Sequence, residues 1–195
     1  EQNSYAGKTN KILSKKAKKI CVAYDGMNAF FDQDKLVLTG NPVRKDLIGL
    51  AGKKAEAINY FGLSENKKTV LVMGGSLGAN TLNQTMAFNM DTISKNNYVQ
   101  WIWQYGKQGI GTFDDANYTK PSHIKSMPFI DRVDLAFAAA DVVLCRSGAL
   151  TISELLSANK PAVLVPAPFV AEDHQSHNAL ALVEKGAAEM VKDNV

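Results

Sequence analysis

Residues 74–79 read Gly-Gly-Ser-Leu-Gly-Ala and lie between a continuously apolar run and a helical pattern that begins at residue 80. Glycines let backbone N–H groups turn towards a ligand, and a helix N-terminus adds free donors and about half a positive charge. The hydroxyl of Ser76 could donate one more hydrogen bond. The loop has the chemistry of a phosphate site, although a tight turn without a ligand can have the same sequence.

The same loop also fits the Gly-x-Ser-x-Gly elbow of α/β-hydrolases, with Ser76 as the nucleophile. A hydrolase needs an Asp and then a His further along the chain, and Asp141 followed by His174 or His177 has that order. No second glycine cluster lies upstream to supply an oxyanion hole. A serine hydrolase is therefore the alternative function. A dinucleotide-binding dehydrogenase module is a third, although the glycines do not follow Gly-x-Gly-x-x-Gly.

A second loop, residues 145–154, reads Cys-Arg-Ser-Gly-Ala-Leu-Thr-Ile-Ser-Glu and again joins an apolar run to a helical pattern. If the helix begins at Gly148 or Ala149, Glu154 lies little more than one turn inside it. A carboxylate there could accept two hydrogen bonds from the vicinal hydroxyls of a ribose. It could instead be an acid that only complements the helix dipole.

A third loop, residues 165–179, leaves an apolar run through two prolines and then becomes densely polar. His174 and His177, beside Glu172 and Asp173, could be metal ligands, but no third ligand group has a characteristic spacing. The same cluster could supply donors and acceptors to sugar hydroxyls. In the linker after the turn at residues 40–42, Arg44 could bind an anion through two N–H groups, or pair locally.

These loops need a scaffold, and the apolar pattern predicts one. Short apolar runs, read as strands, cover residues 20–24, 36–39, 69–73, 99–103, 123–127, 142–145, 162–165 and 187–191. Helical patterns cover residues 8–19, 45–61, 80–88, 131–140, 150–158 and 175–184. From residue 44 onwards this alternation predicts an α/β fold with a parallel sheet and helices on both faces. Ligands of such sheets bind beyond the carboxyl ends of the strands, where all three loops lie.

Composition sets the remaining limits. The 195 residues are 46% hydrophobic and 21% charged, which is typical of a globular protein and excludes a mainly disordered chain. Cys21 and Cys145 form no metal or redox pattern, and the net charge of +3 gives no reason to expect nucleic acid. The first residue is not Met and the last follows a strand pattern, so we expect a piece of a longer protein.

The loops occur together, and in the same order, in one known family. Besides residues 74–79 and 145–154, the Glu-Gln-Asn start, Gly-Asn-Pro-Val-Arg at 40–44 and Asp-His-Gln at 173–175 resemble the MurG-type glycosyltransferases of peptidoglycan synthesis. The resemblance covers nearly the whole chain. It implies a GT-B fold, in which two Rossmann-like domains face each other, with no cofactor and no metal. Residues 1–43 would be the end of the N-terminal domain and its linker, and residues 44–195 an incomplete C-terminal domain.

The resemblance also implies an activity. Such enzymes transfer N-acetylglucosamine from its UDP donor to an undecaprenyl-diphosphate-linked muramyl pentapeptide, as peripheral proteins on the cytoplasmic face of the bacterial inner membrane. The lysine-rich residues 8–19 could then face that anionic surface, or be only a solvated face. The implied donor-binding residues are Asn3, Arg44, Ser76, Ile130, Ala149, Leu150, Thr151, Ile152, Ser153, Glu154 and Gln175.

Within this set the resemblance assigns separate roles. Ser76 and the helix start at residues 149–151 would hold the diphosphate, and Arg44, at the hinge, would belong to the same nucleotide site. Glu154 would bind the ribose, the backbone of Ile130 the uracil, and Gln175 the sugar hydroxyls, with Asn3 approaching from the other domain. Leu77 stands where the family commonly has a polar residue. The family's glycine-rich acceptor loop with its histidine is absent from the sequence, so the catalytic residue is unknown and expected in the missing N-terminal domain.

Overall fold

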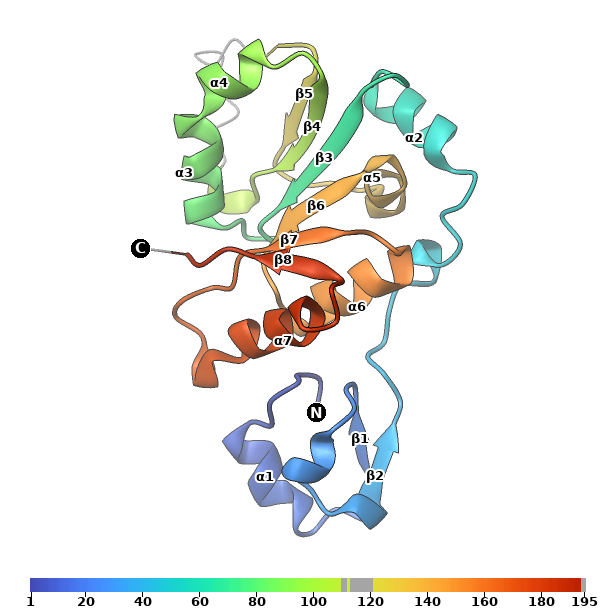
Figure 1. The fold of residues 1–195 in the computed structure, drawn as a ribbon, viewed down its shortest axis with the longest axis vertical. Helices are drawn as coiled ribbons and strands as arrows, with labels where there is room; N and C mark the ends of the chain where they lie inside the picture. The colour runs from blue at the N-terminus through green and yellow to red at the C-terminus, as the bar shows by residue number, and fades with distance from the viewer. Residues whose placement is uncertain (110–111, 113–120, 194–195) are drawn as a thin grey trace.

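The computed structural model describes residues 1–109, 112 and 121–193. A small N-terminal unit, residues 1–43, lies at one end of the molecule, and an extended connection leads from it to a larger α/β unit (Figure 1). Within the described residues no helix is long and apolar enough to cross a membrane.

The N-terminal unit contains two short parallel strands and one α-helix. Its elements are α1 (Lys8–Ser14), β1 (Ile20–Val22), the 3-10 turns η1 (Met27–Ala29) and η2 (Gln33–Lys35), and β2 (Leu36–Leu38). Ile20 pairs with Leu36 in the two-stranded sheet. Only four side chains form its buried core, namely Ala6, Val22, Met27 and Phe31.

The larger unit is built on a six-stranded parallel sheet in the order β5-β4-β3-β6-β7-β8, which confirms the predicted fold class. The strands are β3 (Lys68–Met73), β4 (Val99–Gln104), β5 (Ile124–Met127), β6 (Val142–Cys145), β7 (Ala162–Leu164) and β8 (Ala188–Met190). The helices are η3 (Lys45–Leu47), α2 (Lys54–Phe61), α3 (Asn80–Phe88), α4 (Met90–Lys95), η4 (Lys107–Gly109), α5 (Val133–Ala139), α6 (Ala149–Ala158), η5 (Ala171–Asp173) and α7 (His174–Val183).

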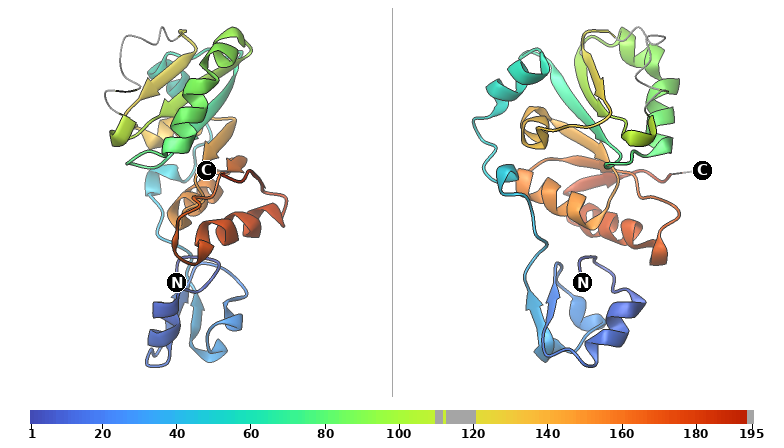
Figure 2. Two further views of the ribbon diagram at one scale, coloured as in Figure 1. Left: turned by 90° about the vertical axis from the view of Figure 1, so that its left-hand side faces the viewer. Right: turned by 180° about the vertical axis from the view of Figure 1, so that it is seen from behind.

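Helices cover the sheet from both sides, as the back and side views show (Figure 2). Successive side chains of a strand point to opposite faces, so Leu71 packs in the core formed with α2 and α5. Its neighbour Val72 packs in a separate core with Met86 of α3 and Met90 of α4. The central strands are therefore apolar on both faces, which explains their continuous apolar runs.

Strand register brings the predicted loops to one edge of the sheet. Met73, the last residue of β3, pairs with Gln104 on one side and with Cys145 on the other. Cys145 in turn pairs with Leu164 of β7. The loops that follow β3, β4, β6 and β7 therefore start side by side, which is the geometry that the sequence predicts.

Two helix predictions need correction, and one helix was not predicted. The pattern at residues 8–19 forms a helix only to Ser14, where the Lys35 ammonium group donates to the last carbonyls. The predicted helix 45–61 is broken into η3 and α2, because Gly49 and Gly52 adopt positive φ angles of 72° and 90°. Helix α4 is missing from the prediction. The other helices begin and end within two residues of their predicted bounds.

Candidate functional site

A cleft of about 580 Å³ lies at the carboxyl edge of the sheet. Five of the predicted donor-binding residues line it: Arg44, Ser76, Thr151, Glu154 and Gln175. Its other lining residues are Met73, Gly74, Gly75, Gly78, Ala79, Gln104, Phe129, Val133, Arg146, Gly148 and Ala167. The structure thus brings together side chains that lie up to 131 residues apart in the sequence, from Arg44 to Gln175.

The glycine loop between β3 and α3 packs closely on the loop after β4. Gly75 and Gly78 have φ angles of 86° and 91°, which L side chains rarely adopt. A Cβ atom on Gly78 would overlap the carbonyl of Tyr105, so glycine is required there for contact as well as for conformation. Helix α3 follows with Ala79 at its N-cap, and no side chain caps it. Its first N–H groups therefore remain as donors at the cleft.

Helix α6 presents a second uncapped N-terminus to the same cleft. Its N-cap is Gly148, which has no side chain to accept the first N–H groups. Thr151 and Glu154, one turn apart, both line the cleft. The structure thus supplies two helix N-termini, Ser76 and Thr151 hydroxyls, and a carboxylate around one space.

Not every predicted residue of α6 reaches the cleft with its side chain. Ile152 is fully buried in the core, and Ala149 is also buried. Leu150 is half exposed but does not line the cleft. The Ser153 hydroxyl turns to the other side of the helix, donates to Ala149 O at 3.0 Å and accepts from Asn41 at 3.1 Å. The side chains of these four residues lie outside the cleft because successive helical residues point in different directions. Their assignment as binding residues stays a prediction, and a contact at the helix start would use backbone N–H groups.

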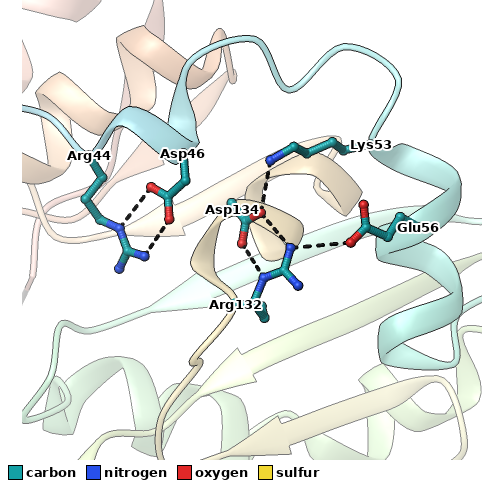
Figure 3. Close-up of polar contacts among 6 residues, drawn as sticks. All are labelled: Arg44, Asp46, Lys53, Glu56, Arg132 and Asp134. Atoms are coloured by element: carbon teal, nitrogen blue, oxygen red, sulfur yellow. Dashed lines mark hydrogen bonds and ion pairs between the residues drawn. The ribbon is translucent and has the colours of Figure 1, made fainter.

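Three charged residues line the cleft, namely Glu154, Arg44 and Arg146. Burial raises the pKa of Glu154, the nearby Arg44 charge partly offsets that effect, and Asp46 adds to it. The Arg44 guanidinium makes two hydrogen bonds to Asp46, at 3.1 and 2.6 Å, and lowers the pKa of that carboxyl (Figure 3). Arg44 therefore pairs locally, as one interpretation of the sequence predicts. It also lines the cleft, where the other interpretation has it bind an anion.

A second charge cluster beside the cleft is structural. The buried carboxylate of Asp134 on α5 accepts from Arg132 at 2.9 Å and from Lys53, next to α2, at 3.1 Å (Figure 3). Hydrogen bonding by Arg132 holds its pKa well below the usual range of Asp. Arg132 also reaches Glu56 at 3.4 Å. The cluster joins α2 to α5 and so fixes the helices behind the cleft.

The loop after β7 is anchored by Gln175. Its side-chain oxygen accepts from Ala167 N at 2.9 Å, and its backbone carbonyl accepts from Ser147 at 2.8 Å. This arrangement leaves the donor end of the side-chain amide for another partner. The two histidines serve elsewhere, because His174 contacts the carbonyl of Ala171 and His177 stacks on Tyr5. Among the described residues no group of three His, Cys, Asp or Glu side chains could hold a metal ion.

Two predicted residues are engaged in other contacts. Ile130 is buried, and its backbone N–H donates to the side chain of Gln104 at 3.0 Å. Asn3 lies outside the cleft, where its side-chain oxygen accepts from Asn178 at 3.0 Å. Asn178 also accepts from the backbone and hydroxyl of Ser4, at 2.9 and 3.2 Å. It thus joins α7 to the N-terminal unit, a role that the sequence does not predict.

Three further cleft residues were missed, namely Gln104, Phe129 and Arg146. Phe129 is half exposed and offers an apolar surface in the cleft. Arg146 donates to Val165 O and Pro166 O, both at 3.1 Å, and forms an ion pair with Asp193 at 2.6 Å. The signal for Gln104 was a polar residue at the end of an apolar strand, which the periodicity alone does not assign to a site.

The geometry gives no support to the serine hydrolase. Asp141 accepts from Thr69 N at 2.8 Å, at the start of β3, whereas Ser76 follows the end of that strand. A carboxylate at the amino ends of the strands cannot orient a histidine beside Ser76, which follows the carboxyl end of β3. Neither His174 nor His177 lines the cleft.

Comparison with known families and relatives gives a consistent result. The family model described as "Glycosyltransferase family 28 C-terminal domain" matches residues 69–195. Relatives from Flavobacterium psychrophilum and Parabacteroides distasonis are 52% and 54% identical and align with 100% and 99% of this chain. Both are named UDP-N-acetylglucosamine–N-acetylmuramyl-(pentapeptide) pyrophosphoryl-undecaprenol N-acetylglucosamine transferase. The chain spans about half the length of these relatives, 52% of each.

Solved structures show the same relationship. The crystal structure of Acinetobacter baumannii MurG matches 98% of this chain and 52% of its own, with 29% identity and a TM-score of 0.70. The glycotransferase of kitacinnamycin matches 91% of this chain and 43% of its own, with 18% identity and a TM-score of 0.65. The second likeness concerns the fold alone, and both are consistent with a GT-B architecture.

Proposed function

Because the chain belongs to glycosyltransferase family 28, whose C-terminal domain covers residues 69–195, we propose that it is the donor-binding part of a MurG-type N-acetylglucosaminyltransferase. The whole enzyme would transfer N-acetylglucosamine from its UDP donor to the muramyl sugar of an undecaprenyl-diphosphate-linked pentapeptide. The observation that carries this proposal is the pair of uncapped helix N-termini, α3 and α6, at one cleft that also holds Glu154.

The diphosphate of the donor would lie between these helix N-termini. Negative charge grows on the diphosphate as the bond to the sugar breaks, and preformed N–H donors stabilise that charge without a metal. Ser76 and Thr151 would add hydroxyl donors. Arg44 would add positive charge at the linker, where it now pairs with Asp46.

The nucleoside and the sugar would occupy the two ends of the cleft. Glu154 would accept hydrogen bonds from the ribose hydroxyls, and the backbone around Ile130 would contact uracil. Gln175 would donate to a sugar hydroxyl through the side-chain amide nitrogen, because its oxygen is held by Ala167 N. For Asn3 to approach the sugar, its amide must leave Asn178.

The N-terminal unit supports a membrane-facing role. Five of its exposed lysines lie in or beside α1, at positions 8, 15, 16, 18 and 19. Ile12 and Leu13 of the same helix are also exposed. Basic residues attract anionic lipid headgroups and exposed apolar side chains can enter the interface. We therefore place the enzyme at the cytoplasmic face of the bacterial inner membrane as a peripheral protein.

No residue of this chain is proposed as the catalytic base. Donor binding is the part of the activity that the chain itself can carry, since the loops after β3, β6 and β7 form one continuous cleft. The test is a titration of the folded chain with UDP-N-acetylglucosamine, with NAD and an acyl fluorophosphonate as probes for the two alternative functions. The expected result is binding of the UDP-sugar and no response to either probe.

A further inference from the structure

We infer that Gln104 is a positioning residue, which sets the relative position of the diphosphate loop and the base-side loop of the cleft. The inference rests on the proposed function for the identity of the nucleotide. Gln104 ends β4 and is 5% exposed. It lies at the floor of the cleft, between the glycine loop and the loop that follows β5.

Gln104 uses both ends of its side-chain amide. The nitrogen donates to Gly75 O at 2.9 Å, and the oxygen accepts from Ile130 N at 3.0 Å. Gly75 is 29 residues before Gln104 and Ile130 is 26 residues after it. One side chain therefore ties together two loops that have no covalent connection near the site, and both loops belong to the proposed nucleotide site.

The hydrogen bond from Gln104 also fixes the direction of the Gly75 carbonyl group, whose oxygen carries a partial negative charge. Gly75 O accepts from Gly78 N at 3.0 Å as well as from Gln104. A carbonyl held by two donors cannot turn towards the cleft, where its oxygen would repel a phosphate. Gly75 adopts a positive φ angle. Because glycine has no Cβ atom, its backbone has more conformational freedom than that of another residue and needs this anchor.

The amide satisfies both partners, since it offers a donor and an acceptor at once. A methionine of similar length makes neither bond. A glutamate still accepts from Ile130 N but, when ionised, cannot donate to Gly75 O and repels it. These two substitutions therefore separate the two contacts.

The chain contains a matched control four residues earlier on the same strand. Gln100 is 1% exposed and also uses both ends of its amide, accepting from Ser64 N at 2.8 Å and donating to Thr69 Oγ1 at 2.9 Å. It lies towards the opposite end of β4 from the cleft. Gln100→Met therefore removes a buried amide from the same strand without touching the cleft loops.

The experiment is calorimetric titration of wild type, Gln104→Met, Gln104→Glu and Gln100→Met with UDP and with CDP. Gln104→Met should bind UDP about tenfold more weakly, since the two hydrogen bonds that hold the loops are lost. Its preference for UDP over CDP should also fall. Gln100→Met should keep the affinity and the preference of wild type, even if its unfolding temperature falls.

Gln104→Glu distinguishes a positioning role from a general effect on stability, because the variant should change the pH dependence of UDP affinity. It should keep the preference for UDP over CDP, because Ile130 N is still held, but lose affinity at neutral pH. As pH falls and the new carboxyl takes up a proton, it can donate to Gly75 O. Its UDP affinity relative to wild type should then recover.

A measurement without any ligand completes the test. The Ile130 amide hydrogen should exchange slowly with solvent in wild type and in Gln104→Glu, and faster in Gln104→Met. Equal UDP affinity in Gln104→Met and wild type, or an equal loss in Gln100→Met, would overturn the inference. A folded wild type that does not bind UDP would overturn the proposed function and this inference together.

Discussion

The carboxyl group of Glu154 lies in a partly buried environment that disfavours its ionised form. Burial raises its pKa, and the Arg44 charge offsets only part of that effect. A carboxyl whose pKa is raised by folding stabilises the protein below its ordinary titration range and loses that contribution as pH rises through the higher folded value. At neutral pH, Glu154 therefore reduces stability while it supplies an acceptor to the cleft.

Replacing Glu154 by Gln should consequently separate stability from binding. The unfolding temperature of Glu154→Gln at neutral pH should rise, and UDP affinity should fall about tenfold, ~1.4 kcal/mol, because hydrogen bonds to a charged acceptor become bonds to a neutral one. The UDP affinity of wild type should fall as Glu154 takes up a proton at acidic pH, and this step should vanish in the variant. Calorimetry over a pH series and thermal unfolding measure these effects.

The matched control is Glu65→Gln, at an exposed carboxylate outside the cleft. It should change neither UDP affinity nor its pH dependence. If Glu154→Gln binds UDP as wild type does, the ribose contact is not made by this residue.

Single residues of the cleft can be predicted from the sequence only where they belong to a local sequence motif. Ser76, Thr151 and Glu154 could be found because each lies in a strand–turn–helix segment. Gln104 could not, because its partners lie 26 and 29 residues away and only the folded sheet brings them together. Motif membership does not show which way a side chain points: helical geometry places the Ile152 side chain in the core, and its assignment to the site stays a prediction.

At the scale of elements, the contact between the glycine loop and the β4 loop should determine how rigid the site is. Gly78→Ala and Gly75→Ala both place a side chain at a positive φ angle, at a cost of about 1–2 kcal/mol. A Cβ atom on Gly78 would also overlap the Tyr105 carbonyl, whereas one on Gly75 meets nothing within 4 Å.

Gly78→Ala should therefore lower the free energy of unfolding by clearly more than Gly75→Ala. Chemical denaturation of the two variants measures the difference, and Gly75→Ala supplies the cost of backbone strain alone. Equal losses would mean that the two loops do not pack as the structure has them.

The elements themselves were largely predictable, because periodicity is a local property. Continuous apolar runs identified β3, β4 and β6, whose residues are mostly buried or half-buried. The break after η3 was missed because a helical pattern at residues 45–61 hides two glycines whose positive φ angles stop the helix. Helix α4 was missed because only Asn89 separates it from α3. Its six residues also have no apolar stripe that would predict a separate helix.

At the scale of the whole molecule, the N-terminal unit depends on the larger one. Its own core has four buried side chains, which is little for independent stability. It is held by the hydrogen bonds of Asn178 to Asn3 and Ser4 and by Glu172, which accepts from Lys8 N at 3.1 Å. Such joints could not be predicted from the sequence, because they link residues more than 160 positions apart.

The lysines of this unit should give the whole molecule a preferred side for anionic membranes. In Figure 1, α1 lies at one end of the molecule and α4 at the other. The double variant Lys15→Glu/Lys16→Glu should lose most of the binding to anionic vesicles, at ~1 kcal/mol per basic residue near the surface. Binding of wild type should weaken as salt increases.

The control for that prediction is Lys67→Glu/Lys95→Glu, which makes the same change in net charge with one half-buried and one exposed lysine outside the N-terminal unit. Vesicle co-sedimentation of the three proteins measures the effect. An equal loss in both double variants would show a response to net charge and not to a membrane-facing surface.

We propose that this chain holds the donor nucleotide of a glycosyltransferase, and calorimetric titration of the folded chain with UDP-N-acetylglucosamine is the decisive measurement. We expect saturable binding at one site per chain, competition by UDP, no heat with NAD, and weaker binding in Glu154→Gln. Absence of saturable binding to the folded wild-type chain, or binding of NAD in competition with UDP, would contradict it.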